Sequence, residues 1–85
     1  MSRNTLNNEV DKKILEEILK EEEEFKEIRR KYANWNFIKK QKPRIRAALE
    51  YYIETGDIRR ACKIAGINIS LFRNLLRKAN IPVIT

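Results

Sequence analysis

The sequence predicts an all-α fold, in which a long N-terminal helix precedes a three-helix unit. The 85 residues include only two glycines and two prolines, while 42% are hydrophobic and 36% are charged, a composition that favours helices. Apolar residues also recur at helical spacing along most of the chain. A chain this short buries only about 60% of its unfolded surface, so we expect it to form a dimer.

The first predicted helix spans residues 8 to 32, where Lys, Glu, Leu and Ile dominate and neither Gly nor Pro occurs. Its apolar side chains follow two heptad rows, although Glu21 breaks one row and Leu15 and Leu19 widen the stripe. The two rows, here called the heptad residues, contain Ile14, Ile18, Phe25, Ile28, Tyr32 and Trp35. We interpret them as a homodimer surface. The alternative is a helix packed on its own domain, and a dimer of swapped or crossing helices would satisfy both.

Residues 33 to 42 lose the helical period and precede Pro43, which disfavours helical angles at Lys42. We therefore predict a hinge or junction here. The region in and just after it holds five bases within eight residues, Lys39, Lys40, Lys42, Arg44 and Arg46. Such a cluster favours phosphate contact, with a solvated basic linker as the alternative. The predicted units are 1–42, an acidic long helix with a basic junction, and 43–85, a helix-turn-helix unit with a short C-terminal tail.

Three short helices are predicted in the second unit. Pro43 begins the first and Gly56 ends it, Asp57 caps the second and Gly66 ends it, and Asn68 or Ser70 caps the third. The residues expected to face inward are Ile45, Ala48, Leu49, Tyr52, Ile53, Ile58, Ala61, Cys62, Ala65, Phe72, Leu75, Leu76 and Ala79.

Two short helices that cross at a tight turn are typical of a helix-turn-helix, whose second helix reads base edges in the major groove. The last predicted helix exposes bases and no acid. Expected base or phosphate contacts from this helix and its start are Asn68, Ser70, Arg73, Asn74, Arg77 and Lys78. Flanking phosphate contacts are expected from Arg59, Arg60 and Lys63 on the preceding helix.

A resemblance supports this interpretation. The spacing of Cys62, Gly66, Ile67, Phe72 and Leu75 resembles that of prokaryotic helix-turn-helix repressors. The segment 61–83, in the C-terminal third of the chain, is also similar to a family of small, poorly characterised prokaryotic proteins regarded as antitoxin-like. The resemblance implies DNA binding and a toxin-like protein as a further partner.

The charge divides sharply along the chain. Residues 1–28 hold five Lys/Arg and nine Asp/Glu, a net charge of −4, whereas residues 29–85 hold fourteen Lys/Arg and three Asp/Glu, a net charge of +11. The basic part therefore favours a polyanion, although membrane surfaces and acidic proteins attract the same charge. The sequence predicts a dimeric transcriptional regulator that binds specific double-stranded DNA. An antitoxin-like or adaptor module with secondary DNA binding is the alternative.

Several classes of function are not expected. The chain has no histidine, which excludes Ser-His-Asp and Cys-His catalysis and zinc sites that use histidine. The single cysteine excludes an internal disulfide and a multi-thiolate metal site. We expect no enzyme activity, no cofactor and no metal. No apolar run approaches the ~20 residues of a membrane helix, and the polar start is unlike a signal peptide, so we expect a cytoplasmic protein without a membrane partner.

Overall fold

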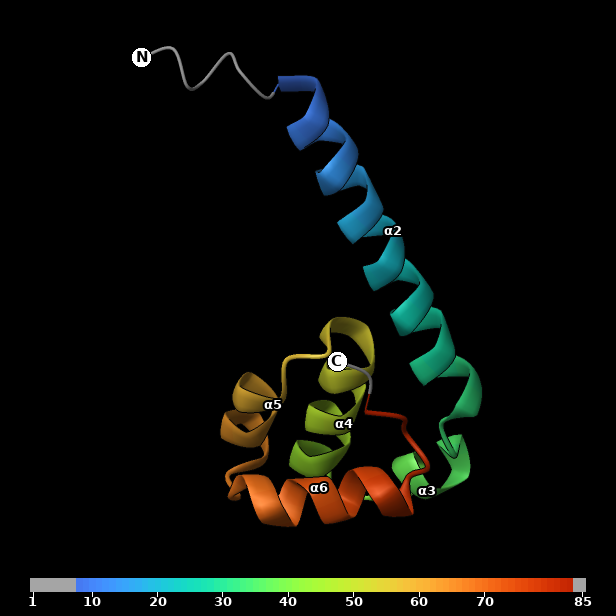
Figure 1. Ribbon diagram of the computed structural model, residues 1–85. Helices are drawn as coiled ribbons and strands as arrows, with labels where there is room; N and C mark the ends of the chain where they lie inside the picture. The colour runs from blue at the N-terminus through green and yellow to red at the C-terminus, as the bar shows by residue number, and fades with distance from the viewer. Residues whose placement is uncertain (1–7, 84–85) are drawn as a thin grey trace.

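The computed structural model describes residues 8–83, with side chains from Lys12 onward. The all-α prediction is confirmed, because these residues form five helices and no strand. The helices are α2 (Asn8–Tyr32), α3 (Trp35–Lys39), α4 (Pro43–Thr55), α5 (Ile58–Ala65) and α6 (Ile69–Lys78). In Figure 1 the four shorter helices gather into one body, and α2 runs along this body and continues well beyond it.

The core lies between α4, α5, α6 and α3. Its largest fully buried side chains are Phe72, Ile38, Leu49, Ile53 and Leu76. The Phe72 ring meets that of Tyr52 edge to face, with 6.1 Å between the ring centroids, a favourable geometry for an aromatic pair. Most residues expected to face inward are buried. Ile45, Ile58, Cys62 and Leu75 are half-buried instead and pack against the core from its edge.

The segment predicted to be a hinge or junction, residues 33 to 42, contains a short helix, α3, at its centre. Asn34 caps this helix, since its side chain accepts a hydrogen bond from the Phe37 backbone N–H at 3.1 Å. Ile38 is then completely buried, and Ala33 just before the helix is buried as well. The hydrophobic core therefore includes residues from both sides of the predicted boundary at Lys42. A single turn of helix is too short to show a clear apolar period, which is why the spacing missed it.

A buried arginine joins α2 to the C-terminal end of α4. Arg29 is only 5% exposed, and its Nε donates a hydrogen bond of 2.9 Å to the Ile53 carbonyl. Its guanidinium also lies 5.8 Å from the centroid of the Tyr52 ring, within range of a cation–π interaction. Gly56 ends α4 in the left-handed region with φ 71°, and a Cβ there would lie 3.1 Å from the Arg29 side chain. Glycine is thus required both by the backbone and by this close approach.

The N-terminal part of α2 is exposed in the part of the chain that the structure describes. Residues 12–24, here called the overhang, are all exposed, and α2 contacts α4. Of the heptad residues, only Phe25 is half-buried, while the other five are exposed. Leu15 and Leu19 of the overhang are 57% and 53% exposed, more than Ile28 at 37%. Four of the exposed large apolar side chains, Ile14, Leu15, Ile18 and Leu19, therefore lie close together on the overhang.

Candidate nucleic-acid interface

Helix α6 exposes polar side chains and also two apolar ones, since Ile69 and Leu71 are 42% and 51% exposed. Its exposed polar residues, here called the α6 row, are Ser70, Arg73, Asn74, Arg77 and Lys78. Phe72 and Leu76 are buried on the opposite face and fix which side points outward. Because Ser70, Asn74 and Arg77 lie four and three residues apart, they share one stripe in the middle of the exposed face. The row contains three bases and no acid.

The two edges of the α6 row lie against different parts of the body. Helix α6 contacts α5; burial raises the pKa of the Cys62 thiol on α5, and the charge of Arg73 on α6 opposes this rise. On the other side, Asn74 and Lys78 line a shallow groove together with Gln41, just before α4. The row is therefore bordered by α5 along one edge and by the start of α4 along the other.

The turn between α5 and α6 is held in place by a side chain from α4. Gly66 adopts φ 73° and its N–H donates to the Cys62 carbonyl at 2.8 Å, which ends α5. Arg44 was predicted to contact phosphate, but its Nε donates a hydrogen bond of 2.7 Å to the Ile64 carbonyl in the last turn of α5. The Arg44 guanidinium lies 3.3 Å from where a Gly66 Cβ would be. The Arg44 side chain thus stabilises the turn at Gly66, which sets the direction of α6.

Both ends of α6 are fixed. At its start, the Asn68 side chain accepts a hydrogen bond of 2.9 Å from the Leu71 N–H, which confirms Asn68 as the cap. Beyond its end, Asn80 has φ 57°, a conformation that asparagine tolerates better than most residues, and its Nδ2 donates to the Tyr32 carbonyl at 2.9 Å. The Asn34 N–H donates to the Ala79 carbonyl at 2.7 Å. These contacts tie α6 to the junction after α2, and the sequence analysis missed them.

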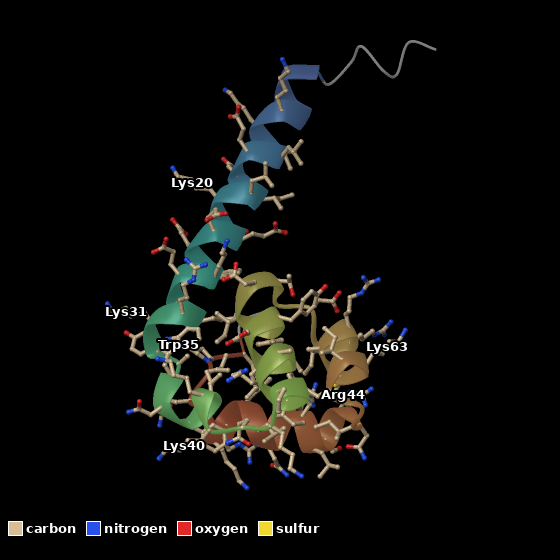
Figure 2. All side chains as sticks on the ribbon, turned by 180° about the vertical axis from the view of Figure 1, so that it is seen from behind. Lys20, Lys31, Trp35, Lys40, Arg44 and Lys63 are labelled. Carbon is tan, nitrogen blue, oxygen red and sulfur yellow. The ribbon has the colours of Figure 1, made fainter. Side chains whose placement is uncertain are left out.

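Helix α5 adds three exposed bases beside the row. Arg59, Arg60 and Lys63 are all exposed, and α5 itself contains no acid. Asp57, just before α5, is occupied as the helix cap, where its carboxylate accepts from the Arg60 N–H at 3.2 Å. Figure 2 shows Lys63 on the outer side of α5, away from α2. The positive charge of α6 therefore extends across α5.

The predicted basic cluster of the junction lies at the other end of the body. Lys39, Lys40, Lys42 and Arg46 are exposed. In Figure 2, Lys40 lies near α3, far from Lys63, with Arg44 between them beside α5. The structure thus distributes the bases over the body rather than gathering them at one point, which favours contact with an extended anion over contact with a single phosphate.

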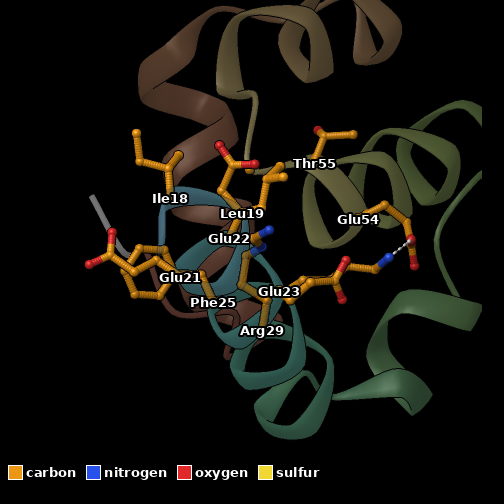
Figure 3. Close-up of a pocket in the computed structure, with 11 residues that line it drawn as sticks. Ile18, Leu19, Glu21, Glu22, Glu23, Phe25, Arg29, Glu54 and Thr55 are labelled. Carbon is orange, nitrogen blue, oxygen red and sulfur yellow. Dashed lines mark ion pairs between the residues drawn. The ribbon is translucent and has the colours of Figure 1, made fainter. Parts of the chain in front are cut away.

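One of the three acids in the basic part pairs with the C-terminal half of α2. Glu54 of α4 pairs with Arg30 at 2.6 Å and with Lys26 at 3.3 Å, both on α2. The hydrogen bond from Arg30 is the main reason that the pKa of Glu54 is lowered. Figure 3 shows Glu54 at the edge of an open pocket of about 780 Å³ between α2 and the end of α4. The Glu54 carboxylate is therefore paired with two basic side chains of α2.

No protein-family model, no curated protein and no solved structure matches this chain. Among residues 12–83, no group of three or more Cys, Asp or Glu side chains is placed to hold a metal ion. None of the helices that the structure describes is both long and apolar enough to cross a membrane.

Proposed function

We propose that this protein binds double-stranded DNA as a homodimer and regulates transcription, with α5 and α6 acting as a helix-turn-helix. The observation that supports this most strongly is the α6 row, an acid-free stripe on a helix whose start, end and preceding turn are each held by hydrogen bonds. A reading helix needs this rigidity, because base-edge contacts depend on positions accurate to a fraction of an ångström.

The chemistry of the row matches that of base recognition. Arginine can donate two hydrogen bonds to the O6 and N7 of guanine, and asparagine can pair with the N6 and N7 of adenine. Asn74 lies in the middle of the exposed face, so it would meet the floor of the major groove. Arg73 and Arg77 lie beside it and would contact guanine edges or phosphates. Ser70 and the Nδ2 of Asn68 would contact the backbone at the start of the helix.

The surrounding bases would supply affinity without sequence preference. Arg59, Arg60 and Lys63 on α5 lie beside the row, and Lys39 and Lys40 lie at the other end of the body, so an extended duplex would meet positive charge at both places. Each phosphate neutralised releases counterions, so the logarithm of the association constant falls by about 0.9 per contact for each unit of log salt concentration. A protein with several such contacts should therefore bind far more weakly at high salt, and a flat salt response would contradict the proposal.

The test measures fluorescence anisotropy on a duplex selected from random DNA and on its scrambled version. Asn74→Ala should lower affinity for the selected duplex by ~1–3 kcal/mol and leave the scrambled one almost unchanged, because only base contacts distinguish the two. Lys40→Ala is the matched control, since it should weaken both duplexes by the same factor. If Asn74→Ala leaves the ratio of the two affinities unchanged, α6 is not the reading helix.

An antitoxin-like or adaptor function is the second candidate, and the overhang is the observation that favours it. An exposed apolar helix face rimmed by glutamates could hold a toxin-like protein with a basic surface. The anisotropy experiment separates the two candidates, because an adaptor that does not use DNA would show no preference for any duplex.

A further inference from the structure

Two large apolar side chains are exposed on the helix that carries the α6 row. Ile69 and Leu71 are 42% and 51% exposed, whereas the other exposed residues of α6 are polar. The two lie two positions apart in the sequence, so they occupy nearly opposite edges of the helix. Leu71 shares its edge with Asn74 and Lys78, which follow it at the helical spacings i+3 and i+7. An apolar side chain therefore lies within the polar surface that we propose meets DNA.

Leu71 borders a groove between α6 and the start of α4, here called the α6 groove. Its volume is about 300 Å³, and its apolar lining consists of Ile45, Ile67, Leu71 and Leu75. Ile45, Ile67 and Leu75 are half-buried and pack against the core, so the fold fixes their positions. Leu71 is more than half exposed and is the member of this set that a bound molecule meets most directly.

The polar lining of the α6 groove contains no acid. It consists of Gln41, Asn74 and Lys78. The Gln41 amide nitrogen donates a hydrogen bond of 3.0 Å to the Phe37 carbonyl, which holds this side chain in place. Asn74 and Lys78 belong to the α6 row. An apolar groove beside an amide and an ammonium group suits an occupant that is apolar at one point and anionic around it.

Thymine in double-stranded DNA has this combination. Its 5-methyl group lies in the major groove and distinguishes thymine from the other bases, and apolar side chains recognise it by contact. The phosphates on either side of the groove supply the negative charge. A purely apolar partner helix fits less well, because it would bury the Asn74 amide and the Lys78 ammonium group without hydrogen-bond partners.

The spacing of Leu71 and Asn74 is close to the spacing of base pairs. Residues three apart on a helix are separated by about 4.5 Å along its axis. Successive base pairs of double-stranded DNA are separated by about 3.4 Å. A helix that presents Asn74 to an adenine in the major groove would therefore hold Leu71 within one base step of that adenine.

We propose that Leu71 determines sequence specificity by packing against the 5-methyl group of a thymine within one base step of the adenine that Asn74 contacts. The methyl group would close the exposed side of the α6 groove. This proposal rests on the proposed function and names one further base of its site. It leaves Ile69, on the other edge of α6, outside the contact.

Deoxyuridine, which is thymidine without the 5-methyl group, tests this contact in the selected duplex. Each thymine is replaced in turn, and fluorescence anisotropy gives the affinities of the wild type, Leu71→Ala and Ile69→Ala. At one thymine, within one base step of the position where Asn74→Ala loses its preference, uracil should lower the wild-type affinity roughly three- to fivefold, as expected for one methyl-sized group. Leu71→Ala should bind the thymine and uracil duplexes almost equally. Ile69→Ala is the matched control and should keep the full loss.

The outcomes separate this contact from the proposed function. If uracil has no effect at any position, or if Leu71→Ala keeps the loss, the inference is overturned. The proposed function survives that result as long as Asn74→Ala still removes the preference for the selected duplex. A wild type that prefers no duplex would contradict both. A loss that Ile69→Ala also abolishes would overturn the assignment to Leu71.

Sedimentation equilibrium without DNA tests whether a second copy of the chain fills the α6 groove instead. Leu71→Ala should have the same oligomeric state as the wild type, and a smaller oligomer would overturn the inference. The substitution replaces an exposed residue by a good helix former, so circular dichroism should show unchanged helix content.

Discussion

Replacing Arg29 by alanine should destabilise the protein more than any other change to a charged residue that the structure describes. Arg29 is the only charged side chain among residues 12–83 that is buried. Its substitution removes the hydrogen bond of 2.9 Å to the Ile53 carbonyl and the cation–π contact with the Tyr52 ring.

The magnitude follows from these contacts. A buried carbonyl that loses its partner costs about 1–3 kcal/mol, and a desolvated cation–π contact adds roughly 1–2 kcal/mol. Because a water molecule can partly replace the donor, we expect a loss of about 2–4 kcal/mol. For a domain of this size, each kcal/mol lowers the melting temperature by about 4–8 °C. The expected fall is therefore roughly 10–25 °C.

The neighbouring residue provides the control. Arg30 makes a shorter contact, 2.6 Å to Glu54, but both side chains are exposed, so water competes for them and Arg30→Ala should change the melting temperature little. The assay is thermal unfolding followed by circular dichroism at 222 nm. If Arg29→Ala and Arg30→Ala lower the melting temperature equally, the argument from burial is refuted.

Three further predictions concern single sites. Gly66→Ala should cost about 1–2 kcal/mol in chemical denaturation, because it forces a Cβ into a left-handed conformation against the Arg44 guanidinium; an unchanged midpoint would contradict the role of this turn. Arg73→Ala should raise the pKa of Cys62 further and slow its alkylation by iodoacetamide, since Arg73 lowers a pKa that burial has raised; a faster reaction would place Arg73 elsewhere. Folding lowers the pKa of Glu54 from 4.5, so its ion pairs add stability above pH 4.5 that is lost as the pH falls through the lower folded pKa. Glu54→Gln should therefore reduce the acid sensitivity of the melting temperature, and equal sensitivity in both proteins would argue against the pairing.

The sequence was sufficient to predict the helices that carry a clear apolar period. The long helix from residue 8 to 32 has the predicted limits, and the helix that begins at Pro43 ends at Thr55, where the predicted Gly56 closes it in the left-handed region. The exposed face of α6 follows from the same period, since burying Phe72 and Leu76 leaves only one side for Asn74 and Arg77. These features depend only on the residues of one helix and its ends, so they can be predicted from the sequence alone.

The features that the sequence analysis missed depend on contacts between distant residues. The helical period places Arg29 on the stripe of Ile18 and Phe25 and Arg30 beside it, but only the position of the α4 end decides that the Arg29 side chain is buried. Arg44 belongs to a basic cluster in the sequence, yet its guanidinium donates a hydrogen bond to the Ile64 carbonyl beside the turn at Gly66. The heptad residues likewise appear as one surface in the sequence, whereas in the structure Phe25 is half-buried and the other five are exposed.

The central claim is that the α6 row reads double-stranded DNA. Selection of bound duplexes from a random library by the full chain tests it most directly. The account predicts enrichment of an inverted repeat whose half-sites lie near 10 base pairs apart, because a two-fold dimer presents two copies of α6 to successive major grooves. It also predicts that Asn74→Ala loses the preference at one base pair in each half-site. A library that shows no enriched sequence after selection by the wild type would contradict the claim.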